Sequence, residues 1–525
     1  MNRNERRARA RLQTNTAAAL HKRAGRTGSA QQAVDVSQRL FQLGKIQEAL
    51  PGLLRAAAAY PDDPGVRGAL AYALASTGQV VPAIQHYRIL LDSQPDTVAA
   101  LTNLALLLIR TGNPDEARQH LQRAALLAPT HANTAFVLAE LLGQQKRTDE
   151  AFREYRRAAV LFRQKIGPHP ALQHCDDLVK LATAQLWTGD LQSGLRSLDL
   201  AVELRPDHAL ALARRGMALA KLRRIPEAIA SLKRAAAAEP GFAEARRALG
   251  EVFLNVGEAG VAQKHFQAAT RLNPADELAR YFLAAARNES PEAPPPSYVV
   301  QLFEAYARNF ERHLVDILQY RAPEIVCEAV LELAGSRAAD WSVIDLGCGT
   351  GLCGPLIRRA SRHLIGVDLS AAMLDKAREK SVYDELKLGD VAHVLGGYAG
   401  AFDLALCTDV MIYLGSLTPI FAAAARALKP GALFAFTTEI HPGAGYVLDN
   451  TGRYLHSRGY VEEVAAAHGF AILHFEPIVA RYQNREPDIH NVFIAEREAA
   501  GGCRPDGQDD CNGTGAIERT ALLAK

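Results

Sequence analysis

The sequence predicts two folds in one chain, an all-α solenoid followed by a doubly wound α/β domain. Two observations predict them. The first half repeats with a period of 34 residues, and the second half contains short apolar runs that each end in an acidic residue. The length of 525 residues supports this division, because it exceeds what a single α/β domain of about 200 residues accounts for.

The repeat has the character of paired helices joined by tight turns. Its period is marked by glycines, alanines and prolines, namely Gly44, Gly78 and Gly112, Ala49, Ala83 and Ala117, and Pro61, Pro95 and Pro129. Alanines let helices pack closely, glycines permit the turn, and prolines stop the second helix. The pattern is typical of the tetratricopeptide repeat. We expect about seven repeats over residues 35–288 with a capping helix over 276–287, and a bend or split near 163–171, where about nine residues are inserted.

Such a solenoid has a concave surface, lined by the first helix of each repeat, that usually binds a protein or peptide. Counting from each turn gives a set of groove candidates: Tyr72, Leu106, Phe136, Met217, Arg214, Arg246 and Arg247. The alternative is that the aromatic and aliphatic members belong to the core, since core residues have the same helical spacing.

The most informative stretch of the second half is VIDLGCGTG, residues 343–351. An apolar run reaches Asp345, and glycines follow at 347, 349 and 351. A strand that ends in such a turn lets backbone N–H groups approach a nucleotide-like cofactor. The same stretch also fits the GxGxxG pattern of dinucleotide sites through Gly349, Gly351 and Gly354. A carboxylate at the mouth of the turn, Asp345, favours a cationic ligand over a pyrophosphate.

Four further apolar runs end in acids. Residues 364–367 lead to Asp368 and Leu369, residues 386–388 to Asp390 and Val391, residues 402–408 to Asp409, and residues 433–438 to Glu439. The carboxyl ends of parallel strands meet at one edge of a sheet, where ligands bind. We expect Asp368 to accept hydrogen bonds from a ribose, Asp390 and Val391 to contact an adenine, and a helix over 371–380 to be capped by Ser370.

On these residues the segment 297–497 resembles a class I S-adenosylmethionine-dependent methyltransferase. The DxGxGxG turn, the acid of the second strand, the Gly389-Asp390 pair and the segment FDLALCTDVMIYL match in order and spacing. The resemblance implies a Rossmann-like, doubly wound domain of seven strands over residues 298–497, with S-adenosylmethionine as cofactor. It also implies a closing hairpin over 471–479 and 491–496 whose last strand is antiparallel, which NAD-binding domains lack.

A proline-rich linker, residues 289–297, separates the two halves. The amphipathic stretch 298–318 that follows is similar to the helix preceding the sheet in bacterial methyltransferases that carry such repeats. The resemblance makes Tyr306, Phe310, His313 and Tyr320 candidates for a lid over the cofactor. The alternative is that the stretch only packs on the sheet.

No catalytic base can be assigned from the sequence. His441 and Tyr413 follow the fifth and fourth strands, so both are candidates to face a methyl acceptor, and Arg453 and His456 form a second group, with Arg453 a candidate to hold an anionic group. Each is equally consistent with a loop residue satisfied by backbone or water.

Composition excludes several classes of protein. The net charge is +3, but the arm of residues 1–34 carries +7, which leaves −4 on the rest, so no nucleic-acid groove is indicated. We expect this arm and the tail 498–525 to be disordered. The seven cysteines show no metal-ligand spacing, and the pairs Cys348–Cys353 and Cys503–Cys511 are expected to be free thiols. No apolar run is long enough for a membrane span, and we expect a bacterial cytoplasmic protein.

Three functional hypotheses remain open. The first is a methyltransferase whose repeats recruit a protein substrate or partner. The second is a small-molecule methyltransferase whose repeats serve assembly. The third is a scaffold whose methyltransferase domain binds the cofactor without turnover.

Overall fold

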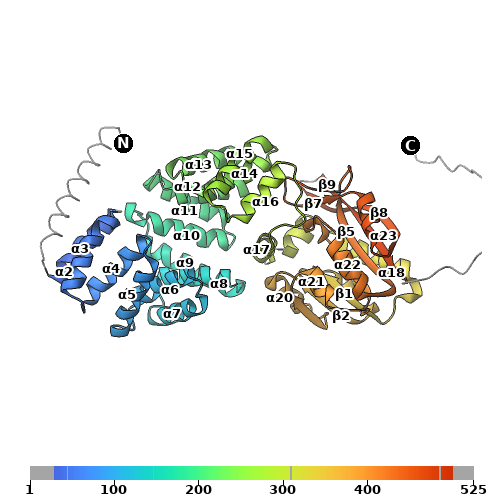
Figure 1. Cartoon of the computed structure of the whole chain (residues 1–525), viewed down its shortest axis with the longest axis horizontal. Coiled ribbons are helices and arrows are strands. Elements are labelled where there is room, and N and C mark those ends of the chain that lie inside the picture. The colour runs from blue at the N-terminus through green and yellow to red at the C-terminus, as the bar shows by residue number, and fades with distance from the viewer. Residues whose placement is uncertain (1–28, 44, 146, 308–309, 484–485, 500–525) are drawn as a thin grey trace, which may run out of the picture.

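The computed structural model describes residues 29–43, 45–145, 147–307, 310–483 and 486–499. Helices fill the first half, and a twisted sheet flanked by helices fills the second (Figure 1). The described residues contain no helix that is both long enough and apolar enough to cross a membrane. Most of the predicted arm and tail, including Cys503 and Cys511, lies outside the described residues.

In the described part of the solenoid, seven antiparallel helix pairs are followed by a single helix, α16. The helices are α2 (Ala30–Gln42), α3 (Ile46–Ala59), α4 (Pro64–Ser76), α5 (Val80–Ser93), α6 (Val98–Arg110), α7 (Pro114–Leu127), α8 (Ala132–Gln144), α9 (Thr148–Ile166), α10 (Cys175–Trp187), α11 (Leu191–Leu204), α12 (Ala209–Lys221), α13 (Ile225–Ala238), α14 (Ala243–Asn255), α15 (Ala259–Leu272) and α16 (Glu277–Ala286). They stack into an arch (Figure 1). The turn glycines Gly78 and Gly112 have φ of 84° and 80°, a conformation that only glycine adopts without strain.

The inserted residues lengthen the solenoid locally without dividing it. Helix α9 has 19 residues where the other second helices have 14. A short 3₁₀ turn, η1 (Leu172–His174), then leads into α10. One buried apolar cluster continues across this point, from Val36 to Ala218. The expected split is therefore absent from the described residues.

The groove candidates divide into exposed and buried residues. Tyr72 and Leu106 are exposed, at 40% and 37% of their surface. Phe136 is buried against Tyr155 and Phe162, so its assignment to the groove is wrong and the core alternative holds for it.

The remaining groove candidates are partly buried. Met217 packs against the core of the later repeats, and Arg246 is half-buried. Arg214 pairs with Glu244 at 3.4 Å, whereas Arg247 pairs with both Glu251 and Asp276.

The second half is built on one sheet with strand order β3-β2-β1-β4-β5, to which β9 and β8 are added antiparallel on the far edge of β5. The strands are β1 (Trp341–Leu346), β2 (Ser361–Asp368), β3 (Glu385–Leu388), β4 (Phe402–Cys407), β5 (Leu428–Ile440), β6 (Tyr446–Leu448), β7 (Tyr454–His456), β8 (Phe470–Gln483) and β9 (Glu486–Arg497). This is the expected doubly wound topology with its closing hairpin.

The described sheet has nine strands rather than the expected seven. The additional pair is the hairpin β6–β7. Glu439, near the end of β5, pairs with Leu455 of β7 on one side and His490 of β9 on the other, so β7 extends the sheet beyond the end of β4. Strands of three residues carry too little apolar pattern to be read from a sequence.

Helices cover both faces of the sheet. One face packs against α21 (Val391–Gly396), α22 (Thr418–Ala427) and α23 (Arg458–Ala467), and the other against α18 (Ala322–Ala334) and α19 (Cys353–Ile357). Neighbouring β1 residues, Val343 and Ile344, belong to opposite faces. This explains why β1 is apolar without alternation, as expected for a strand buried on both sides.

The linker does not separate the two folds. Helix α17 (Pro296–Tyr306) begins two residues before the predicted linker ends, with Pro296 in its first turn, where proline is well tolerated. Tyr281 and Phe282 of α16 share a buried cluster with Leu448 and Tyr454 of the β6–β7 hairpin. The Tyr281 hydroxyl donates to the backbone oxygen of Gly452 at 3.0 Å. The last solenoid helix and the hairpin thus have a common core.

Candidate active site

The glycine turn after β1 has three residues in the left-handed region, with φ of 67°, 54° and 84° at Gly347, Gly349 and Gly351. Each glycine is required for a different reason. A Cβ at Gly347 would lie 2.2 Å from Val410 Cγ2, whereas a Cβ at Gly349 would meet only the Phe310 ring, at 3.9 Å. The backbone at Gly349 is therefore open to a ligand.

Tyr383, which the sequence analysis missed, accounts for the other glycines. Its ring would lie 2.9 Å from a Cβ at either Gly351 or Gly354. Gly354 is thus explained by packing and not by a dinucleotide. The Tyr383 hydroxyl donates to Asp345 Oδ2 at 2.6 Å. Tyr383 lies in a loop without a motif, so no local signal points to it.

Asp345 lies beneath the turn and not at its mouth. Its side chain is buried, it does not line the cavity described below, and Asp345 Oδ1 has no hydrogen-bond partner. Burial raises the pKa of Asp345 to about 7, partly opposed by the hydrogen bond from Tyr383 and reinforced by the charge of Asp368. This position differs from the expected one, because β1 buries its last acid along with its apolar residues.

Asp368 ends β2 and reaches the turn. Its carboxylate accepts hydrogen bonds from Gly349 N at 2.9 Å and Ser370 N at 2.8 Å. Burial raises the pKa of Asp368 to about 6, although these backbone hydrogen bonds oppose the shift. Ser370 caps α20 (Ala371–Glu379) by accepting from Met373 N, as predicted.

A cavity of about 610 Å³ opens above the turn. Seven of the predicted cofactor residues line it, namely Gly347, Gly349, Asp368, Leu369, Asp390, Val391 and Asp409, while Asp345 and Gly351 do not. Asp390 also caps α21 by accepting from His393 N at 2.9 Å. Three of the five strand-end acids, Asp368, Asp390 and Asp409, therefore line one cavity, whereas Asp345 and Glu439 do not.

The roof of the cavity comes from the segment that joins the two folds. Val299 and Phe303 of α17 line it, as do Phe310 and Tyr320 from the lid candidates. His313 is not among the lining residues, and the side chain of Tyr306 lies outside the described part of the structure. Tyr320 also packs in the core beneath the sheet, so the segment both covers the cavity and packs on the sheet.

The wall at the end of β4 contains a set of ion pairs that the sequence analysis did not predict. We call it the buried charge cluster; it consists of Asp409, Glu439, Arg453, Arg481, Asp488 and His490. Arg481 contacts three carboxylates, Asp409 at 2.5 Å, Asp488 at 2.8 Å and Glu439 at 3.4 Å. Arg453 pairs with Glu439 at 2.8 Å, and His490 Nδ1 lies 3.1 Å from Asp409. Three acids are thus matched by two guanidinium groups and an imidazole.

The pKa shifts in the buried charge cluster follow from these contacts. Burial alone would lower the pKa of His490, but hydrogen bonds with Asp409 and Asp488 raise it to about 9. Burial opposes the ionisation of Asp409, yet Arg481 and His490 hold its pKa well below the usual value. Burial raises the pKa of Glu439 to about 7, with Arg453 opposing the shift. Asp409 and His490 are therefore both charged at neutral pH.

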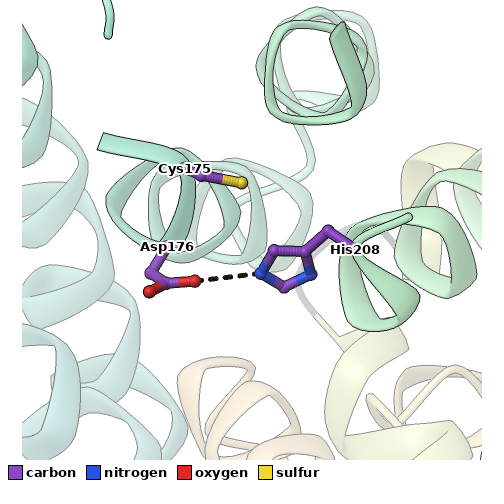
Figure 2. Close-up of side chains that lie close together, drawn as sticks. All are labelled: Cys175, Asp176 and His208. Atoms are coloured by element: carbon purple, nitrogen blue, oxygen red, sulfur yellow. Dashed lines mark hydrogen bonds and ion pairs between the residues drawn. The ribbon is translucent and has the colours of Figure 1, made fainter. Parts of the chain in front are cut away.

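Two described groups have the spacing of metal ligands, and neither suits a cation. Glu439, Asp488 and His490 already face Arg481. In the other group, the Nε2 atom of His208 lies 2.9 Å from Asp176 and its Nδ1 accepts from Ala211 N at 3.2 Å (Figure 2). Both imidazole nitrogens of His208 are thus occupied, and the neighbouring Cys175 thiol donates to Ala201 O at 3.5 Å.

Of the four candidate catalytic residues, two line the cavity and two do not. Tyr413 and Arg453 line the cavity. His456, grouped with Arg453 in the sequence analysis, does not line the cavity, since it is fully buried in β7 and its Nε2 donates to Gly415 O at 3.1 Å. Burial lowers the pKa of His456 to about 4. His441 does not line the cavity either.

Comparisons with known proteins follow the same division. A methyltransferase-domain family model matches residues 343–431, and tetratricopeptide-repeat models match residues 37–98, 96–170, 179–243 and 214–275. A ubiquinone biosynthesis O-methyltransferase from Xanthomonas oryzae pv. oryzae is 33% identical over 121 residues, covering 22% of this chain and 48% of that protein. An 18S rRNA (guanine-N(7))-methyltransferase from Mus musculus is 33% identical over 125 residues, covering 23% of this chain and 41% of that protein.

The chain spans less than half the length of these two relatives. Among solved structures, an S-adenosylmethionine-dependent methyltransferase from Mesorhizobium loti is 20% identical with a TM-score of 0.27, over 34% of this chain and 100% of that one.

Proposed function

Because the chain joins tetratricopeptide repeats to a methyltransferase domain, we propose that it is an active S-adenosylmethionine-dependent methyltransferase whose repeats recruit a protein partner. The observation that carries the proposal is the position of Asp368. This acid lines the cavity beside Gly349 and is fixed there by two backbone N–H groups.

S-adenosylmethionine is the cofactor, and the residues of the cavity suit it. The backbone at Gly349 has no side chain in the way of a nucleoside, and each oxygen of Asp368 keeps a lone pair for a ribose hydroxyl. Asp390 and Val391 are proposed to contact the adenine. Asp368, Asp390 and Asp409 all line the cavity, and lining carboxylates favour the cationic methionine part over a pyrophosphate, although Asp409 is already paired with Arg481. Asp345 and Gly351 are proposed to shape the turn from beneath.

When bound, S-adenosylmethionine supplies a methyl group made electrophilic by the positive charge on its sulfur. The protein's own task is then to align the acceptor and exclude water. Burial raises the pKa of Tyr413, so this hydroxyl stays protonated and orients an acceptor as a hydrogen-bond donor. Arg453 is proposed to hold an anionic group of the acceptor. No general base is assigned.

One observation favours a second candidate, a small-molecule acceptor. Pro294, Pro296, Val299 and Phe303 of the joining segment, together with Tyr413, give the cavity a mainly apolar lining of the kind that binds small molecules. In that case the repeats would bring the enzyme to an assembly and not to its substrate. We place the protein in the cytoplasm, where the five described cysteines, all of them free thiols, would remain reduced.

Two measurements test the proposal. Calorimetric titration of S-adenosylmethionine into the full chain and into Asp368→Ala should show an affinity loss of about 100-fold, because two ribose hydrogen bonds to a charged group are removed. Equal affinities would remove the site. Incubating lysate with methyl-labelled cofactor then separates the acceptors: label on protein supports recruitment, label in the small-molecule fraction supports the second candidate, and no transfer indicates a silent domain.

A further inference from the structure

Glu304 of α17 joins the solenoid to the cofactor loop through its two carboxylate oxygens. We propose that Glu304 is a positioning residue that sets the affinity for S-adenosylmethionine and makes that affinity depend on the solenoid. The inference rests on the proposed function, because it concerns the cofactor site of that reaction.

On the cofactor side, Glu304 Oε1 accepts from the Ser370 hydroxyl at 3.0 Å and from Ala372 N at 3.4 Å. The same serine gives its backbone N–H to Asp368 and accepts from Met373 N. Ser370 therefore has three ordered hydrogen bonds, and its hydroxyl can point only one way. A carboxylate at the first turn of α20 is also favoured by the helix dipole. Glu304 thus fixes the residue next to the predicted ribose ligand.

On the solenoid side, Glu304 Oε2 accepts from the Thr148 hydroxyl at 2.6 Å. Thr148 is the first residue of α9, the second helix of the fourth repeat. Its side chain is buried, and the next turn of the helix contributes Ala151 to the solenoid core. A displacement of α9 would therefore move Glu304, since Thr148 and Glu304 share a short, partly buried hydrogen bond.

Helix α17 itself lies over the cavity, between the arch and α20 (Figure 1). Phe303, next to Glu304, packs edge-on against Tyr413 with ring centroids 5.3 Å apart. Beyond α17, Glu311 pairs with Lys380 at the other end of α20, at 2.6 Å. The roof segment therefore contacts both ends of α20, through Glu304 at the first end and Glu311 at the second. Glu304 also contacts Thr148 of the solenoid.

The consequence is reciprocal coupling between the two folds. If a partner bound in the groove shifts α9, the Thr148–Glu304–Ser370 contacts change and the cofactor affinity changes with them. By linkage, bound cofactor must alter the affinity for that partner by the same factor. Recruitment and cofactor loading would then occur together.

The test is calorimetric titration of S-adenosylmethionine into the full-length protein and into six variants, of which Asp368→Ala is the one already described. Glu304→Ala should raise the Kd about 10-fold, since it removes hydrogen bonds to a charged acceptor. Glu304→Gln keeps an oxygen for Ser370 and an amide donor for Thr148, so it should stay within about threefold of wild type. Thr148→Val, which loses only the hydroxyl, should raise the Kd about threefold.

The double variant Thr148→Val with Glu304→Ala decides whether Thr148 affects cofactor binding only through Glu304. We expect its Kd to equal that of Glu304→Ala, because the threonine would act only through the glutamate. A further loss of about threefold would show independent effects and overturn the proposal. The matched control is Thr188→Ala, whose hydroxyl bonds within its own helix and should leave the Kd unchanged.

The titrations distinguish a wrong cofactor site from a wrong coupling between the two folds. If Asp368→Ala binds as tightly as wild type, the proposed cofactor site is wrong. If Asp368→Ala weakens binding but Thr148→Val and Glu304→Ala do not, only the coupling is wrong. Should Glu304→Ala not fold, Thr148→Val alone decides, since an unchanged Kd overturns the proposal and a rise of about threefold, absent in Thr188→Ala, supports it.

Discussion

At the end of β2, Asp368 is held by two backbone N–H groups, whereas at the end of β4, Asp409 is held by the side chains of Arg481 and His490. Both acids line one cavity, yet the pKa of the first is raised and that of the second is lowered. The pKa values differ because the hydrogen-bond partners differ. Neutral backbone amides offset less of the free-energy cost of burying a carboxylate than cationic side chains do. Asp368 can therefore change its charge near neutral pH, whereas Asp409 stays charged.

The largest effect should come from a substitution in the buried charge cluster. Arg481→Met removes the cation shared by three buried carboxylates, which should cost about 3–5 kcal/mol of unfolding free energy and lower the Tm by about 10 °C. Scanning calorimetry measures this. The control Arg378→Ala removes an exposed pair with Asp375 and should change stability by less than about 0.5 kcal/mol. Similar Tm values for both variants would contradict the account of the buried charge cluster.

The glycine turn offers the next largest contrast. Gly347→Ala places a Cβ against Val410 in a left-handed backbone, so it should lose more than about 2 kcal/mol of stability. Gly349→Ala has the same backbone strain without the clash, so it should be more stable than Gly347→Ala but should bind the cofactor more weakly. Tm and calorimetric Kd measured on both variants would separate the two roles. Identical Tm values would show that the close approach to Val410 is unimportant.

The pH dependence of cofactor binding sharpens the comparison. The pKa of Asp368, which lines the cavity, is raised to about 6, so this carboxyl group is charged mainly above that pH. Because a carboxylate attracts the cationic ligand, affinity should be full above about pH 7 and fall as pH drops through about 6, by about 10-fold per unit for the proton taken up. Titrations between pH 5 and 8.5 measure this, and Asp368→Asn should lose the component near pH 6. A flat profile in wild type would contradict it.

The smallest effect concerns the junction of the two folds. Tyr281→Phe removes the hydrogen bond to Gly452 and should cost about 1 kcal/mol, or about 3 °C in Tm. The Kd for the cofactor should stay within about twofold, because Thr451 and Arg453 of the hairpin line the cavity but are not among the proposed cofactor residues. A large loss of cofactor affinity would show that the junction supports the cofactor wall as well.

The sequence was informative where the structure is local. The repeat period, the glycine turn and the acid at the end of each strand all lie within short windows, and these parts of the fold were predicted correctly. The buried charge cluster depends on the register of β9 against its two neighbours, since β8 places Arg481 opposite Asp488 and β5 places Glu439 opposite His490. Such pairings join distant segments and leave no local pattern.

The wrong or missing predictions have the same origin. Phe136 has groove spacing, but the long helix α9 brings Phe162 and Tyr155 over it. His456 follows a loop in sequence, yet it lies inside β7, a strand too short to recognise. Tyr383 and Glu304 act through partners 38 and 66 residues away, Asp345 and Ser370.

The shared core of α16 and the β6–β7 hairpin has a consequence for how the chain is made. Without the repeats, a fragment of residues 298–497 would expose Tyr298, Leu448 and Tyr454 to water. Together they would form an apolar surface that promotes aggregation. In the intact polypeptide the repeats leave the ribosome first, so their last helix is already in place when the hairpin emerges. The last helix of the repeats can therefore cover the apolar surface of the hairpin as soon as the hairpin is synthesised.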